Sequence, residues 1–152
     1  MTERTVTHAT FAIERIYPQS PSRVFHALSD KAAKEKWFNG PSGWERRQHE
    51  LDFRIGGREI SVVAPPGGTA HIFNAVYQDI VPDQRVVFSY EMSFDEVRIS
   101  VSLTTIELRP EGQGTRLLFT EQGAFLDGYD GADSREHGTK LLLDALGRSL
   151  LD

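Results

Sequence analysis

Residues 52–57 read Asp-Phe-Arg-Ile-Gly-Gly and stand near the start of a run of β-hairpins that extends from Trp44 to Thr120. Two adjacent glycines are typical of a two-residue hairpin turn, because glycine reaches positive φ without a Cβ clash. This stretch therefore indicates a fold and no chemistry of its own. The hairpins lie between a helical stretch near the N-terminus and one long C-terminal helix, which predicts a curled antiparallel sheet that encloses a cavity.

The elements around the hairpins have clear boundaries. Alternating residues predict a first strand over residues 8–16. Ser20 is a suitable N-cap with Pro21 in the first helical position, and a second short helix is expected over residues 30–38. Turns rich in glycine, proline and aspartate then separate six further strands. Leucines at helical spacing predict a last helix from about Ala132 to Leu150.

Strand parity predicts which side chains share a face of the sheet. Three such groups are expected: Val86, Phe88, Tyr90 and Met92; Val97, Ile99, Val101 and Leu103; and Leu117, Phe119 and Glu121. At Thr104 and Thr105 the apolar parity slips by one residue, which predicts a β-bulge there.

Length and composition exclude several classes of protein. A chain of 152 residues fits one domain, residues 1–152. No apolar run approaches the roughly 20 residues that cross a bilayer, and the first residues lack the features of a secretion signal, so we expect no membrane span and a cytoplasmic protein. The absence of cysteine agrees with that location. A net charge of −5 without a basic cluster argues against nucleic acid as a partner.

Motifs for metals and cofactors are missing from the sequence. The five histidines show no ligand-like spacing, and no His-Glu-x-x-His occurs, so no metal site is expected. No serine forms a nucleophile elbow, and no Gly-x-Gly-x-x-Gly follows a strand, so neither a hydrolase nor a dinucleotide cofactor is expected.

Several segments together carry a family resemblance: residues 13–16, 21–25, 27–38, 52–57, 79–88 and 114–121. Over nearly its whole length the chain resembles the Hsp90-ATPase-activator-like branch of the START/polyketide-cyclase (SRPBCC) superfamily. The resemblance implies an α+β helix-grip fold of the START-like or Bet v 1-like type. In that fold a curled antiparallel sheet of about six to seven strands wraps a long C-terminal helix, with two short helices after the first strand.

One departure from the family concerns the last helix. Relatives usually have Gly-Trp at the inner part of this helix, whereas Gly138 is followed here by Thr139. The resemblance therefore implies more room and a different polarity at this side of the cavity. Ligands of the relatives that carry the tryptophan should not be transferred to this chain.

Ten residues are candidates for lining the cavity: Trp37, Phe38, His71, Phe73, Phe88, Tyr90, Met92, Glu121, His137 and Leu141. For the aromatic residues the alternative is plain core, and for the histidines it is simple exposure. Glu121 shares its face with apolar residues, and an ionised carboxylate is costly to bury without a partner. A cation could offset this cost, and His137 is the nearest candidate for it. The alternative is that Glu121 faces the solvent.

Three functions fit these expectations. The first is binding of a small hydrophobic or amphipathic molecule, which would be the partner, with no catalytic residue and no cofactor. The second is a cyclase or dehydratase that acts on a polyketide-like substrate, with Glu121 or His137 as acid or base. The third is a cofactor of an Hsp90-type chaperone, although the Hsp90 activator proper has a further N-terminal domain for which 152 residues leave no space. The sequence leaves both a monomer and a homodimer open.

Overall fold

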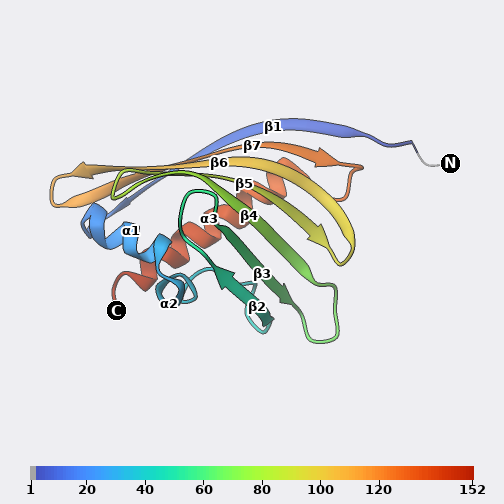
Figure 1. The fold of residues 1–152 in the computed structure, drawn as a ribbon, viewed down its shortest axis with the longest axis horizontal. Coiled ribbons are helices and arrows are strands. Elements are labelled where there is room, and N and C mark those ends of the chain that lie inside the picture. Colours follow the sequence, from blue (N-terminus) through green and yellow to red (C-terminus); the bar gives the residue numbers. More distant parts are fainter. Residues whose placement is uncertain (1–2) are drawn as a thin grey trace.

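The computed structural model describes residues 3–152. Its elements follow one another in this order: β1 (Val6–Tyr17), α1 (Pro21–Ser29), α2 (Lys31–Lys34), β2 (Glu45–Leu51), β3 (Arg58–Ala64), β4 (His71–Val81), β5 (Arg85–Phe94), β6 (Val97–Glu111), β7 (Gly114–Leu126) and α3 (Ala132–Ser149). The seven strands form one antiparallel sheet in the order β1-β7-β6-β5-β4-β3-β2. The sheet curls, and α3 runs along one face of it (Figure 1). The predicted α+β helix-grip architecture is confirmed.

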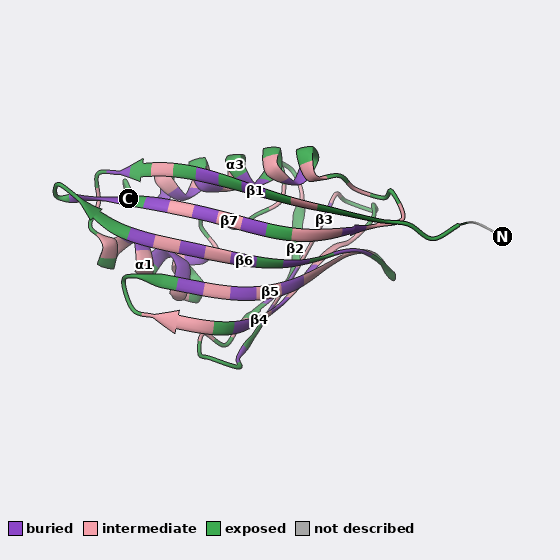
Figure 2. Cartoon of the chain, turned by 90° about the horizontal axis from the view of Figure 1, so that it is seen from above, coloured by how far each residue is buried: buried purple, intermediate pink, exposed green. Residues whose placement is uncertain are grey.

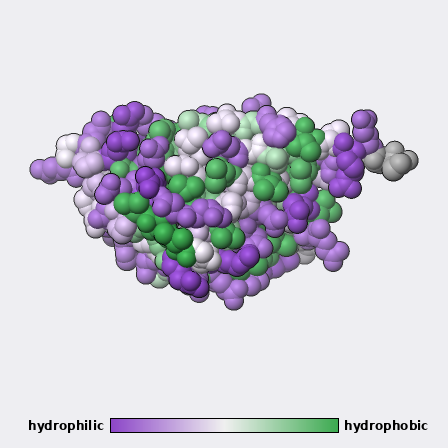
Figure 3. Space-filling model, turned by 45° about the horizontal axis from the view of Figure 1, so that its top comes forward, coloured by the Kyte–Doolittle hydropathy of each residue, from purple (hydrophilic) through white to green (hydrophobic). Residues whose placement is uncertain are grey.

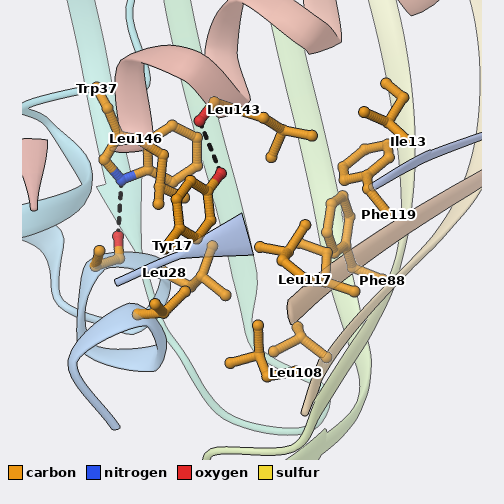
Figure 4. Packing of buried hydrophobic residues seen from close by; sticks show 14 of the residues in the cluster. Ile13, Tyr17, Leu28, Trp37, Phe88, Leu108, Leu117, Phe119, Leu143 and Leu146 are labelled. Atoms are coloured by element: carbon orange, nitrogen blue, oxygen red, sulfur yellow. Dashed lines mark hydrogen bonds between the residues drawn. The ribbon is translucent and has the colours of Figure 1, made fainter. Parts of the chain in front are cut away.

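The main core lies between the concave face of the sheet and the helices. Burial alternates along the strands, as expected when one face of each strand packs inward (Figure 2). Leu143 and Leu146 of α3 pack into the same cluster as the inward aliphatic and aromatic residues of the sheet (Figure 4). The buried Tyr17 hydroxyl donates to the backbone oxygen of Leu143 at 2.7 Å, which ties β1 to α3.

The segment 52–57 does not form the two-residue turn that its glycines predict. It is a six-residue connection between β2 and β3, and it also bonds to β4. Gly56 N–H donates to the oxygen of Tyr77 at 2.8 Å, and Tyr77 N–H donates to the oxygen of Gly57 at 3.0 Å. Gly56 has the predicted positive φ, +83°, whereas Gly57 does not. The prediction of a two-residue hairpin loop is wrong: the tight turn spans residues 54–57, closed by Gly57 N–H to the oxygen of Arg54 at 2.8 Å, and the glycines also bond to a third strand.

The β-bulge in β6 lies elsewhere than the sequence predicts. The register between β5 and β6 shifts between Met92 and Ser93, where Ile99 has no partner of its own. From Ser100 onward β6 pairs continuously with β7, so no slip occurs at Thr104 and Thr105.

This bulge separates Ile99 from the face that we predicted for β6. Ser100, Ser102 and Thr104 are buried, whereas Val101 and Leu103 are about 41% and 40% exposed. The apolar pair belongs to the outer face of the sheet, where apolar and polar side chains alternate (Figure 3). Of the four residues predicted to share a face, Val97, Val101 and Leu103 are all partly exposed, whereas Ile99 is fully buried, so the prediction is wrong for Ile99. The inward hydroxyls lie within hydrogen-bond reach of the carboxylate of Glu121 and the guanidinium of Arg135.

Helix α2 is attached to the sheet by a buried ionic network. Lys34 Nζ lies 2.6 Å from Glu59 Oε1, which also accepts a 2.6 Å hydrogen bond from the Tyr77 hydroxyl. His49 Nε2 lies 2.8 Å from Glu59 Oε2, and His49 Nδ1 lies 2.7 Å from Glu35 Oε2. With a carboxylate at each ring nitrogen, His49 is suited to the doubly protonated, cationic form.

The network changes the acidity of its members. Burial by itself raises the pKa of Glu59, but the charge of Lys34 and the hydrogen bonds from His49, Lys34 and Tyr77 outweigh burial and hold the pKa at about 2. The hydrogen bond to Glu59 raises the pKa of His49 against the opposing effect of its own burial, and Glu35 adds to the rise. Folding therefore favours the carboxylate form of Glu59 and the protonated form of His49.

Gly57 should tolerate no side chain. A Cβ atom at this position would collide with the backbone oxygen of Asp52, whereas Gly138 in α3 has no such neighbour within 4 Å. We expect Gly57→Ala to lower the free energy of unfolding by about 1 kcal/mol or more, and Gly138→Ala to raise it by about 0.5–1 kcal/mol through helix propensity. Urea unfolding of both variants tests this. Equal stability of Gly57→Ala and the parent would contradict the geometry of the connection.

The stability of the protein should fall as His49 loses its proton. Because the pKa of His49 is raised in the folded state, its contribution is fully present below about pH 6.5, the ordinary histidine value, and is lost as pH rises through the folded-state pKa. The loss amounts to about 1.4 kcal/mol for each unit of pKa difference. Urea unfolding between pH 6 and 9 should show this slope in the parent and in the control His137→Gln, but not in His49→Gln. A slope that persists in His49→Gln would assign it to another group.

Candidate functional site

A second buried ionic network lies under the first turns of α3. Glu121 of β7 is 1% exposed, and its Oε2 accepts hydrogen bonds from Tyr90 at 2.8 Å and Ser102 at 3.0 Å. Arg135 Nη1 lies 3.3 Å from the same oxygen and donates to the Tyr90 hydroxyl at 2.8 Å. Glu121 Oε1 receives only a long contact of 3.5 Å from Thr104. One carboxylate oxygen is thus saturated and the other nearly free.

Arg135 comes from the start of α3 and reaches two further acceptors. Its Nη2 donates to Ser100 Oγ at 2.8 Å and to Asp130 Oδ2 at 3.1 Å, just before the helix. Burial lowers the pKa of Arg135, but Tyr90, Glu121 and Asp130 outweigh burial and raise it overall. Burial and the Glu121 charge raise the pKa of the Tyr90 hydroxyl, which therefore stays protonated. The network is a neutral phenol between a carboxylate and a guanidinium.

A row of aromatic rings lies between the two ionic networks. The ring of Phe73 is 5.1 Å from that of Phe38 and 4.8 Å from that of Tyr90, measured between centroids. Phe88 closes the group at 6.1 Å from Phe73. Lys34 Nζ stands 4.6 Å from the centroid of Phe38, within range of a cation–π interaction. The aromatic side chains therefore connect the site of Lys34 with that of Arg135.

A hollow of about 450 Å³ opens at the loop between α2 and β2, and the aromatic residues of the row do not line it. Its lining is formed by Asn39, Gly40, Pro41, Ser42, Gly43, Trp44, Arg46 and Val63. In the register of the sheet Val63 pairs with His71, so both face the same side as Phe73. The ring centroids of Trp44 and His71 are 4.7 Å apart, and those of His71 and Phe94 are 4.4 Å apart. The hollow therefore lies on the concave side of β2 and β3. None of the ten predicted site residues lines it, and His71 only packs against its Trp44.

The predicted site residues fall into three groups. Trp37, Phe73, Phe88, Tyr90 and Glu121 are buried on the inner side, while Phe38, Met92 and His71 are half-buried. His137 and Leu141 are exposed on the outside of α3.

The inward orientation predicted for His137 and Leu141 is wrong for a geometric reason. The inner face of α3 is set by Arg135, Thr139 and Leu143, which follow one another at intervals of four. His137 and Leu141 are each offset by two residues from this series, and two residues turn a helix by about 200°. The cation beside Glu121 is accordingly Arg135, and not His137 as expected.

Sequence reasoning missed Arg135, Lys34, Glu59 and the inward serines of β6. The spacing of Arg135, Thr139 and Leu143 was the available signal, since it marks one face of a helix. Thr139 stands where the family resemblance places a tryptophan. It is buried, and its hydroxyl donates to the backbone oxygen of Arg135 at 2.8 Å.

Two negative findings apply to residues 3–152. None of the helices there combines the length and the apolar character that crossing a bilayer requires. Across the same residues, no three His, Asp or Glu side chains gather in a way that could hold a metal ion.

The comparisons with known proteins agree with this architecture. A crystal structure of a protein from Rhizobium loti is 52% identical and superposes with a TM-score of 0.89, covering 95% of this chain and 99% of that one. A structure from Rhizobium leguminosarum is 44% identical, with a TM-score of 0.93 and 98% of both chains covered.

A third structure, an activator-like protein from Aeromonas hydrophila, shares the fold at 19% identity, with a TM-score of 0.72 over 93% of this chain and 92% of that one. No curated protein matches the chain. The family model described as "Activator of Hsp90 ATPase homolog 1-like protein" matches residues 18–150. The chain therefore belongs to the family of proteins like activator of Hsp90 ATPase homolog 1.

Proposed function

We propose that this protein binds a small hydrophobic or amphipathic molecule on the concave side of the sheet, between the α2–β2 loop and α3. The observation that carries the proposal is the hollow beside Trp44. Its volume of about 450 Å³ lies within the range of roughly 300–1,000 Å³ that is typical of small-molecule sites.

The lining of the hollow suits a molecule with an apolar body and a polar edge. Trp44 and Val63 supply apolar surface, while Asn39 and Arg46 supply polar groups. Arg46 Nη2 already donates to the backbone oxygen of Glu35 at 2.7 Å and contacts the side-chain oxygen of Asn39. The guanidinium is therefore held in place at the rim, as an orienting group in a binding site should be.

The aromatic row from Phe38 through Phe73 to Tyr90 is packed core, in which Phe73, Tyr90 and Glu121 are 8%, 6% and 1% exposed. A longer ligand would have to displace these side chains for its polar end to reach Glu121 Oε1, which has only the long contact from Thr104. A hydroxyl or amine on the ligand would match this acceptor. The ligand is therefore expected to carry a donor at one end and apolar carbon along its length.

A substitution that fills the hollow should abolish binding. Val63 lines the hollow, and its neighbour Val62 points to the opposite face of β3. We expect the dye anilinonaphthalene sulfonate to bind the native protein and to be displaced by a medium-chain fatty acid. Val63→Trp should weaken dye binding by at least about tenfold.

Val62→Trp is the matched control and should leave dye binding unchanged. Trp44→Phe should remove any change of intrinsic fluorescence on binding, since the second tryptophan, Trp37, is buried away from the hollow. A native protein that binds neither dye nor fatty acid would contradict the proposed function. If Val62→Trp and Val63→Trp lose dye binding equally, the dye binds outside the hollow.

Acid–base catalysis on a polyketide-like substrate is the second candidate function, and the nearly free Glu121 Oε1 favours it. A carboxylate beside a phenol and a guanidinium could take a proton from a substrate carbon or hydroxyl. In an enzyme, Glu121→Gln should lower turnover by about 10²-fold or more while binding persists. In a binder, the parent turns over nothing, and Glu121→Gln changes only ligand affinity. Product formation from a polyketide-like substrate, followed by mass spectrometry, separates the two.

A further inference from the structure

A smaller hollow of about 210 Å³ is lined by residues of α1, of α2 and the turn after it, and of the carboxyl end of α3. These elements lie close together in Figure 1. Basic and small side chains share its lining: Arg23, His26, Ala27, Ala33, Lys36 and Ser149. The alanines and the serine leave the space open, and the three basic residues surround it. None of these residues belongs to the hollow beside Trp44.

Arg23 and Lys36 differ from most basic residues of this chain. Most arginines and lysines lie within 4.0 Å of a carboxylate. Within residues 3–152 the side chains of Arg23 and Lys36 have no such partner, although the protein is acidic, with a net charge of −5. His26 has only Asp30, at 3.9 Å, and that carboxylate already accepts from Ala33 N–H at 2.9 Å.

The carboxyl end of α3 acts on the positive charges of Arg23 and Lys36. A helix end of this kind carries a partial negative charge that favours basic side chains nearby. Ser149 donates its hydroxyl hydrogen to the backbone oxygen of Leu146 at 2.7 Å. The groups that remain able to donate into the hollow are thus the three basic side chains.

We propose that this hollow binds the phosphate group of a small phosphomonoester. A guanidinium, an ammonium and an imidazole together match the charge and the several oxygens of a phosphate dianion better than those of a single carboxylate. The volume of about 210 Å³ admits a phosphate with a small substituent. The phosphate of a lipid headgroup has the same chemistry, but the net charge of −5 would oppose approach to an anionic membrane. This inference uses none of the residues of the proposed ligand site, so each can fail without the other.

Titration calorimetry with inorganic phosphate tests the proposal, against chloride at equal ionic strength. We expect phosphate to bind the parent protein and to shift the amide NMR signals of α1 and of residues 31–36. Arg23→Gln and Lys36→Gln should each weaken binding by at least about tenfold. Arg58→Gln is the matched control, because Arg58 is also exposed and without a carboxylate partner in residues 3–152.

The variants should fold, since Ser20 caps α1 through the backbone N–H of Arg23 and not through its side chain. If the basic residues served only the end of α3, the variants would lose stability but keep the parent's response to phosphate, and the proposal would be overturned. Binding that chloride reproduces would overturn it as well. Vesicles of phosphatidylcholine with and without phosphatidic acid separate the two sources. If the protein sediments with vesicles only when phosphatidic acid and Arg23 are both present, the phosphate belongs to a lipid. If the protein does not sediment with either kind of vesicle, the ligand is a soluble phosphomonoester.

Discussion

Two buried carboxylates on the concave face of the sheet determine where the helices pack against it. Glu59 of β3 and Glu121 of β7 are 0% and 1% exposed, and each is approached by a tyrosine hydroxyl and by one cation from a helix. Lys34 brings α2 to Glu59, and Arg135 brings α3 to Glu121. A buried carboxylate without its cation is strongly unfavourable, by about 3–5 kcal/mol when one partner of such a pair is removed. Each helix is therefore specified by a charge as well as by its apolar face.

This arrangement explains features of the sheet that apolar packing alone does not. β6 presents Ser100, Ser102 and Thr104 inward and leaves Val101 and Leu103 partly in solvent. The inward hydroxyls bond to Glu121 and Arg135, so the polar groups satisfy one another where water is excluded. A buried polar network stabilises the fold most when its members are all paired, and Glu121 Oε1, with its long contact from Thr104, is the exception here. The bulge at Ile99 directly precedes this run of inward hydroxyls.

The segment that follows α2 links the structural network to both hollows. Lys34 anchors the segment at Glu59, and Lys36 lines the hollow near the end of α3. Residues 39–44 then form most of the wall of the hollow beside Val63. His49 and Glu35 belong to the same network, so the segment begins beside the buried histidine.

The sequence by itself determined the elements whose signals are local. Ser20 and Asp30 cap their helices by accepting from Arg23 N–H and Ala33 N–H, and six strands follow α2 in the predicted order. Such features depend on neighbours a few residues away, and the type and spacing of the residues suffice to predict them. The burial of Glu121 also followed from parity along one strand.

Only the tertiary structure decided which polar groups meet. Glu121 and Arg135 lie on different elements, and so do Lys34 and Glu59, so no periodicity within one segment pairs them. The rotation of α3 places Arg135, and not His137, beside Glu121. After the extra residue at Ile99, the serines of β6 face inward and its valine and leucine face outward. Both arrangements depend on the free energy of burying a charge. That cost arises only when segments distant in the sequence come together and exclude water.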